Sequence, residues 1–341
     1  MDLPIRLSTG EEHEPVISAD GAFGAPGLEL SHWPGNRTPR ELRHELSTGI
    51  ALRFAELDPR RRRELAADAV AIVNNHVDTD GVCSLFAIRH PEAARERRDA
   101  LLAAAGAGDF FRFPSEHALA VDALVTGALD AERSPFDLAG LGAHERHELA
   151  MHELIERLPA ILDGELEPYA DLWRAELERA ILDRAALDSG SRDDLVHLDL
   201  TVWSAGGDPG RHALFGTSPA DRQLVIGAGP GQGSGATFRF LLSTLSWFDL
   251  DRPSQPRPDL AALAGRLNED EGSDPGGELA WRHQDPGGAS PELWFGTAGL
   301  ESFSEHAEGH LHPSRLAPVH VRSRIVEALR ERWVFPGDAR A

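Results

Sequence analysis

One strand–loop–helix unit constrains the fold of this chain more than any other segment. Residues 69–75 read AVAIVNN, a continuous apolar run that ends in two asparagines, as buried strands of parallel sheets do. A polar loop follows at 76–81, and the apolar positions of 82–90 then recur at the spacing of one helical face until Pro91. We predict that strand 69–75 lies centrally in a parallel sheet, with the loop at its carboxyl end.

Further strand and helix patterns surround this unit. Residues 28–33 alternate like a short strand, and 38–47 begin with a capping-box pattern and a proline at the first helical position. A second helix over 91–105 leads to a predicted strand at 109–113. The alternation of strands and helices predicts an α/β N-terminal domain with a doubly wound, mostly parallel sheet.

The pattern changes in the second half of the chain. Residues 144–188 carry helical apolar stripes, and a Ser/Gly-rich break at 188–191 then suggests a domain boundary. We predict domain 1–188, with a helical extension, and domain 189–341, an α+β domain with a largely antiparallel sheet. Its predicted strands are 195–203, 212–216, 223–228, 236–247, 279–281 and 293–296, its helices follow Pro258 and Pro318, and 268–277 is a predicted loop.

Charge composition excludes some partners and some chemistry. The chain has 34 basic and 56 acidic residues, a net charge of −22, which repels duplex nucleic acid and anionic membrane surfaces. Every basic residue is arginine, so a Schiff-base lysine and a phosphate-loop lysine are excluded. Cys83 is the one cysteine, which excludes disulfides within the chain and cysteine-type zinc sites.

The sequence also shows no membrane or export signal. No apolar run approaches the ~18 residues of a membrane-spanning helix, and the polar N-terminal segment lacks the core of a signal peptide. We therefore expect a cytoplasmic protein that binds no membrane; its oligomeric state stays open.

The loop after strand 69–75 carries the strongest chemical signal. His76, Asp78 and Asp80 supply one imidazole and two carboxylates at the strand end, where open α/β sheets bind ligands. This mixture suits Mn²⁺, Fe²⁺ or Zn²⁺ better than Ca²⁺. Gly81 allows the chain to turn into a helix whose N-terminus favours an anion. The alternative is that one aspartate caps that helix and His76 is only a polar strand end.

Residues 72–85, IVNNHVDTDGVCSL, resemble the first motif of the DHH phosphoesterase superfamily: an apolar strand, His-x-Asp-x-Asp-Gly, and a helix with an early small residue. The resemblance implies a two-domain α/β hydrolase of phosphoesters and phosphoanhydrides. It also implies that His76, Asp78 and Asp80 bind a two-metal centre, usually manganese. The family's Asp-His-His motif is absent, and Asp109 begins a predicted strand where the family's second-motif Asp would end one.

Two other loops are candidates for substrate binding. His32 and Asn36 belong to the polar strand-end loop 31–36, where they could hold a phosphate or a leaving group. Gly233 and Ser234 belong to a glycine-rich segment, 227–236, that could cradle a phosphate on backbone N–H groups. The residues after this segment read as a strand, which disfavours a dinucleotide fingerprint and leaves a plain hairpin connection as the alternative.

A third histidine pattern lies near the C-terminus. His306, His310 and His312, with Glu305 beside them, have metal-ligand spacing in a predicted loop. They would suit a one-metal hydrolase.

The sequence favours a metal-dependent phosphohydrolase with a divalent metal, Mn²⁺ being the expected ion. Its substrate would be a small phosphoester, a phosphoanhydride or a short oligonucleotide rather than duplex nucleic acid. The alternative is a non-catalytic DHH-like module that binds a nucleotide or a protein, because the family's histidine pair is missing.

Overall fold

The structure is a computed structural model that describes residues 3–229, 235–250, 255–307, 309–331 and 333–334. The chain divides into two compact units, Met1–Glu178 with Phe248–Pro253, and Arg179–Trp247 with Ser254–Ala341. The boundary predicted at 188–189 falls at the end of helix α8 (Ala170–Ser189), whereas the units part within that helix. The short return of the chain to the first unit at 248 was not predicted.

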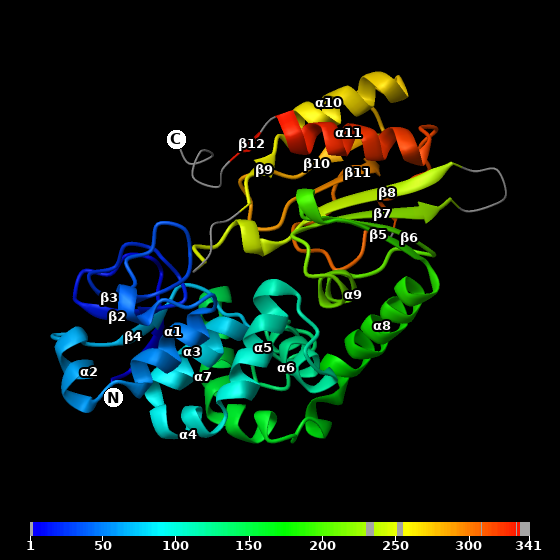
Figure 1. The fold of residues 1–341 in the computed structure, drawn as a ribbon. Helices are drawn as coiled ribbons and strands as arrows, with labels where there is room; N and C mark the ends of the chain where they lie inside the picture. The colour runs from blue at the N-terminus through cyan, green and yellow to red at the C-terminus, as the bar shows by residue number, and fades with distance from the viewer. Residues whose placement is uncertain (1–2, 230–234, 251–254, 308, 332, 335–341) are drawn as a thin grey trace. The chain divides into compact units, whose positions relative to one another are not determined.

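The first unit contains a four-stranded parallel sheet (Figure 1). Its strands are β1 (Ile5–Leu7), β2 (Val16–Ala19), β3 (Gly27–Leu30) and β4 (Ile72–Asn74), in the order β1-β4-β2-β3. Strand β4 pairs in parallel with β1 and with β2. The prediction of a central parallel strand with the 76–81 loop at its carboxyl end is therefore confirmed, although the strand is shorter than the predicted 69–75.

Helices pack on this sheet through one large apolar core. The core joins Ile17, Leu30 and Ile72 of the sheet to buried side chains of the helices, for example Phe54, Phe86 and Leu154. The helices of the unit are α1 (Ser47–Glu56), α2 (Pro59–Leu65), α3 (Thr79–Arg89), α4 (Pro91–Glu96), α5 (Arg98–Phe110), α6 (Glu116–Ala128), α7 (Ala143–Leu162) and α8, with 3₁₀ turns η1 (Arg40–Leu42) and η2 (Glu167–Tyr169).

The alternating residues of the strands face a second, smaller cluster. Val16 and Val73 pack there with Ala25, Ala71 and the partly buried Phe23.

The strands and helices of this unit make its fold class mixed α/β with a parallel sheet. The doubly wound arrangement is a finer statement that stays a prediction.

Two local predictions in this unit were wrong. No helix begins at Thr38, because its side chain accepts a hydrogen bond from the Ser31 N–H (2.8 Å) and donates one to the Ser31 carbonyl (2.6 Å), which closes the loop instead. The predicted strand 109–113 is also absent, because α5 continues through Phe110 and ends at Phe111, whose φ of 52° is left-handed.

The second unit contains a six-stranded sheet in the order β10-β11-β8-β7-β6-β5. Its strands are β5 (Ser191–Leu195), β6 (Leu200–Ala205), β7 (Arg222–Ala228), β8 (Ala236–Leu242), β10 (Ala280–His283) and β11 (Glu292–Gly296). The pairs are antiparallel except β6 with β7, which agrees with a largely antiparallel sheet. Helices α10 (Leu260–Glu271) and α11 (Pro318–Glu331) share an apolar core with the sheet.

The remaining elements of this unit correct three predictions. The predicted strand 212–216 is helix α9 (Arg211–Thr217), and the predicted loop at 268 begins inside α10. Strand 236–247 is shorter than predicted, because β8 ends at Leu242 and the 3₁₀ turn η4 (Thr244–Ser246) follows. The other short elements are η3 (Val196–Leu198) and the pair β9 (Arg257–Pro258) and β12 (Trp333–Val334).

Among the described residues, no helix is both long enough and apolar enough to cross a lipid bilayer.

Candidate metal centre

Two groups of ligand-type side chains gather at the carboxyl ends of the parallel strands. One group is Asp20, His32, Asp80 and Asp109, and the other is Asp20, His76 and Asp78. Within each group the ligand atoms lie within 4.8 Å of one another. We call the first group the inner set and the second the outer set; Asp20 belongs to both.

Strand ends and helix starts bring these residues together. Asp20 directly follows β2, where its φ of 66° is left-handed, and His32 follows β3 by two residues. His76 lies in the loop after β4, and Asp78 is the N-cap of α3. Because parallel strands end at one edge of a sheet, these residues meet although 56 positions separate Asp20 from His76 in the numbering.

His32 has a defined tautomer. Its Nδ1 atom lies 2.6 Å from the Glu45 carbonyl oxygen, which can only accept, so Nδ1 carries the proton. In the neutral ring Nε2 is then the acceptor nitrogen; it lies 3.0 Å from Asp109 Oδ2, 3.6 Å from Asp80 Oδ2 and 3.7 Å from Asp20 Oδ1. Histidines that bind a metal through one ring nitrogen typically donate the N–H of the other ring nitrogen to a carbonyl or a carboxylate.

Two atoms of the inner set are buried without a hydrogen bond. Nε2 of His32 and Oδ1 of Asp20 have no hydrogen-bond partner among the described residues, and their side chains are 0% and 1% exposed. With a neutral His32 ring both atoms are acceptors that face other acceptors. A buried polar atom without a hydrogen-bond partner is costly, and a cation bound between these atoms would remove that cost.

Asp80 has a structural role as well. Its Oδ2 accepts from the Ser47 N–H and its Oδ1 from the Thr48 N–H, both at 2.8 Å, so the carboxylate sits on the N-terminus of α1. Each carboxylate oxygen retains a second lone pair. Asp80 can therefore anchor α1 and still contribute to the inner set.

Asp78 is placed for both roles that the sequence left open, the helix cap and the candidate metal ligand. Oδ1 of Asp78 caps α3 by accepting from the Gly81 N–H at 2.8 Å, while Oδ2 lies 3.1 Å from His76 Nε2. That same nitrogen lies 2.9 Å from Asp20 Oδ2, so the two oxygens of Asp20 face different sets. Side chains of His76 and Asp78 are 28% and 41% exposed, which makes the outer set the accessible one.

The pKa shifts follow from crowding of buried carboxylates. Burial, then the charge of Asp20, raises the pKa of Asp80 to about 6, and burial with the charges of Asp80, Asp78 and Asp20 raises the pKa of Asp109 well above its ordinary value. Burial opposes ionisation of His76, but the charges of Asp78 and Asp20 outweigh it and raise its pKa. Without a cation, protons must partly neutralise the cluster; a divalent ion would do so instead.

A side chain at position 81 would crowd the cluster. A Cβ on Gly81 would lie 2.4 Å from Asn74 Nδ2 and 3.2 Å from Asp20 Oδ2. Asn74 Nδ2 in turn donates to Asp20 Oδ2 at 3.5 Å. The close approach of α3 to the ends of β2 and β4 therefore depends on a residue without a side chain.

The structure distributes the predicted ligands His76, Asp78 and Asp80 over the two sets instead of one. It also places His32, predicted to bind substrate, in the inner set. Asn36, the other residue predicted in that loop, binds the Trp33 carbonyl (2.8 Å) and is not part of either set.

Sequence reasoning missed Asp20 and misjudged Asp109. The signal for Asp20 was present, since Val16–Ala19 is a short apolar run that ends in Asp-Gly, as the 69–81 segment ends in polar residues and glycine. Asp109 lies in the last turn of α5, not at the start of a strand.

The remaining predicted sites are the glycine-rich segment 227–236 and the histidines near the C-terminus. Gly233 and Ser234 lie outside the described residues; the strands on either side of their segment, β7 and β8, pair in antiparallel fashion, as in a hairpin. His306 Nε2 binds Asp183 (2.7 Å) and His310 Nδ1 lies 3.1 Å from the Ala298 carbonyl. Among the described residues, His306, His310 and His312 belong to no metal-type cluster.

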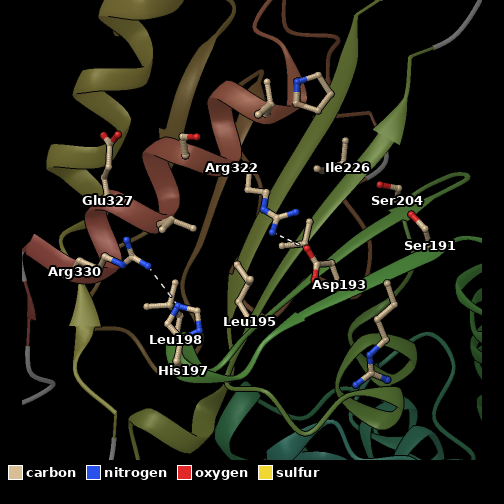
Figure 2. A pocket seen from close by; sticks show the side chains of 16 residues that line it. Ser191, Asp193, Leu195, His197, Leu198, Ser204, Ile226, Arg322, Glu327 and Arg330 are labelled. Carbon is tan, nitrogen blue, oxygen red and sulfur yellow. Dashed lines mark hydrogen bonds and ion pairs between the residues drawn. The ribbon is translucent and has the colours of Figure 1, made fainter.

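A groove in the second unit is the other candidate for ligand binding. It has a volume of about 670 Å³ and lies between α11 and the β5–β6 edge of the sheet. Figure 2 shows two contacts across it, from Arg322 to Asp193 (2.6 Å) and from Arg330 to His197 (3.4 Å). The groove contains none of the predicted site residues and no metal-type cluster among the described residues.

Comparison with known proteins gives a family and no function. Residues 7–338 match a family of unknown function, DUF6687. No curated protein matches the chain significantly. Because the match spans nearly the whole chain, including both units and both ligand sets, the chain belongs to the DUF6687 family.

Proposed function

We propose that this protein is a metal-dependent phosphohydrolase with a two-metal centre in which Asp20 bridges the inner and outer sets. The observation that carries the proposal is a pair of buried atoms without a hydrogen bond among the described residues, His32 Nε2 and Asp20 Oδ1, which lie within a group of carboxylates. The ligands are oxygen and nitrogen atoms without sulfur, a combination that suits Mn²⁺. The resemblance of residues 72–85 to the DHH superfamily supports the same reaction class.

The two sets of ligand-type residues differ in their exposure to solvent. His32, Asp80 and Asp109 would hold one ion in a buried position, and His76 and Asp78 the other where solvent reaches them. A bound pair of divalent ions supplies a nucleophilic water and neutralises charge on phosphoryl oxygens. The chain itself supplies orientation: Glu45 fixes the His32 ring and Asn75 Oδ1, 2.9 Å from Nδ1, fixes that of His76.

The net charge of the chain limits the range of possible substrates. A net charge of −22 repels polyanions over a long range, so a compact phosphorylated metabolite or a short oligonucleotide is favoured over duplex nucleic acid.

One observation favours the alternative of a non-catalytic, DHH-like module that binds a nucleotide or a protein. Both oxygens of Asp80 are engaged by the N-terminus of α1, so this carboxylate has a structural use that needs no metal. The family's Asp-His-His motif is also absent.

Asp78→Asn separates the two functions. Asparagine keeps an oxygen to cap α3, so the fold should persist with little change in stability. The lost charge faces His76 in the outer set, so Mn²⁺-dependent hydrolysis of a generic phosphodiester or of pyrophosphate should fall at least 100-fold. The measurement is phosphate or nitrophenol release with and without Mn²⁺, beside thermal melting.

The matched control is Asp58→Asn, which changes the exposed N-cap of α2, where Asp58 Oδ1 accepts from the Arg60 N–H at 2.9 Å. It should leave hydrolysis unchanged. A wild-type protein that binds Mn²⁺ but hydrolyses none of these substrates would favour the binding module. A wild type that neither binds Mn²⁺ nor gains thermal stability from it would refute the metal centre.

A further inference from the structure

The His32 ring is covered by a segment that lies far from it in the sequence. Phe248 stacks on the imidazole with ring centroids 3.8 Å apart and an interplanar angle of 20°. The next residue, Asp249, donates its backbone N–H to the His32 carbonyl at 2.8 Å. Both residues belong to Phe248–Pro253, the short return of the chain to the first unit.

Asp249 also fastens the loop that follows His32. Its Oδ2 accepts from the Gly35 N–H at 3.1 Å and from Asn36 Nδ2 at 3.2 Å. Gly35 has a φ of 75°, so the loop turns sharply at this point. Three hydrogen bonds therefore hold the loop against Asp249, one of them at the ligand residue itself.

Phe248 contacts a second ligand-bearing element. Its ring meets the Phe110 ring edge to face, with centroids 5.8 Å apart and an angle of 78°. Phe110 directly follows Asp109, the inner-set carboxylate that lies 3.0 Å from His32 Nε2. Phe248 is 6% exposed, so this aromatic group is a packed part of the unit.

We propose that Phe248 and Asp249 are positioning residues for the inner metal site, so that its affinity depends on a segment the chain delivers on its return from the second unit. The proposal rests on the metal centre proposed above. Hydrogen bonds and packing behind a ligand fix its orientation, and their removal typically weakens metal binding about 10–100-fold. Phe248 lies against the ring plane of His32, whereas His76 and Asp78 of the outer set follow strand β4.

The test is a Mn²⁺ titration of the full chain followed by electron paramagnetic resonance, which counts free and bound ions without any substrate. Phe248→Leu and Asp249→Ala should each weaken at least one of the two Mn²⁺ sites by about 10-fold or more. Asp249→Asn keeps an acceptor and loses only the charge. It should restore most of the affinity that Asp249→Ala loses, because the hydrogen bonds, not the charge, position the loop.

Matched controls separate positioning from general effects. Phe238→Leu removes the same ring from the core of the second unit, and Asp285→Ala removes an exposed aspartate whose Oδ1 accepts from the Gly287 N–H at 2.9 Å. Both controls should bind Mn²⁺ as the wild type does. If Phe248→Leu and Asp249→Ala bind two Mn²⁺ with wild-type affinity, this proposal fails and the metal centre stands. If the wild type binds no Mn²⁺, both fail together.

Discussion

At the scale of single residues, two carboxylates of the candidate metal centre each have two sets of partners. Asp78 gives one oxygen to a helix cap and turns the other to His76, and Asp80 sits on the N-terminus of α1 while it faces His32. A capping role and a ligand role are therefore compatible within one carboxylate.

Gly81 provides the first test at this scale. In Gly81→Ala the new Cβ would lie 2.4 Å from Asn74 Nδ2, so Asn74 and its bond to Asp20 must shift. We expect a loss of about 1–3 kcal/mol in the free energy of unfolding, measured with urea.

Gly265→Ala is the matched control, because a Cβ at this position of α10 meets nothing within 4 Å. Alanine should stabilise the helix by about 0.5–1 kcal/mol. Equal effects of the two substitutions would contradict the crowding that we describe around Asp20.

The pair of His306 and Asp183 gives a prediction about pH. Burial lowers the pKa of His306, but the hydrogen bond and charge of Asp183 and the charge of Glu305 outweigh it and raise the pKa above 6.5. A histidine whose pKa is raised by folding contributes its full stabilisation at a pH below its pKa in the unfolded protein, about 6.5. That contribution is lost as the pH rises through its pKa in the folded protein.

The free energy of unfolding that His306→Gln loses should therefore be larger near pH 5.5 than near pH 9. Urea denaturation at both pH values measures it. His13→Gln, at an exposed position outside this ion pair, serves as the control. A loss for His306→Gln that does not vary with pH would contradict the ion pair.

At the scale of elements, Asp80 links α3 to α1. Two backbone N–H groups at the start of α1 donate to its carboxylate, and Thr48 Oγ1 donates to its backbone carbonyl at 3.1 Å. The N-terminus of α1 lacks a side-chain cap of its own, since Leu46 occupies the N-cap position. Asp80 therefore satisfies donors that the sequence near α1 leaves open.

Asp80→Asn should destabilise the protein even without metal. An amide has one acceptor oxygen, so its NH₂ group would face one of the two N–H donors, and a buried unsatisfied donor costs about 1–3 kcal/mol. Asp78→Asn, in contrast, keeps its cap and should lose little. Urea denaturation of both variants in the presence of a chelator makes the comparison. Equal stabilities of the two variants would contradict the link between α3 and α1.

The elements also show what the sequence could predict. Strand β4 and helix α3 were predictable because a continuous apolar run followed by polar residues and a 3.6-residue period suits a buried strand and a helix. Residues 110–113 were not, because FFRF has the composition of a strand, whereas the alanine-rich helix before it extends through Phe110 and stops at a left-handed Phe111.

At the scale of the whole molecule, half of the candidate centre could be found from the sequence. His76, Asp78 and Asp80 are close in sequence and follow one recognisable strand. Asp20 also ends a recognisable apolar run, but its place beside them depends on the order β1-β4-β2-β3, and that of Asp109 on the packing of α5 on α3, which no local pattern contains. The role of Phe248 depends on a return of the chain that its own residues do not signal.

If two metal ions share Asp20, the number of Mn²⁺ ions that each chain binds depends on this one carboxylate. Equilibrium dialysis should give two ions for the wild type and for the exposed control Asp137→Asn, and neither ion at the same free concentration for Asp20→Asn. A wild type that binds fewer than two ions, or an Asp20→Asn variant that binds as many as the wild type, would contradict the account.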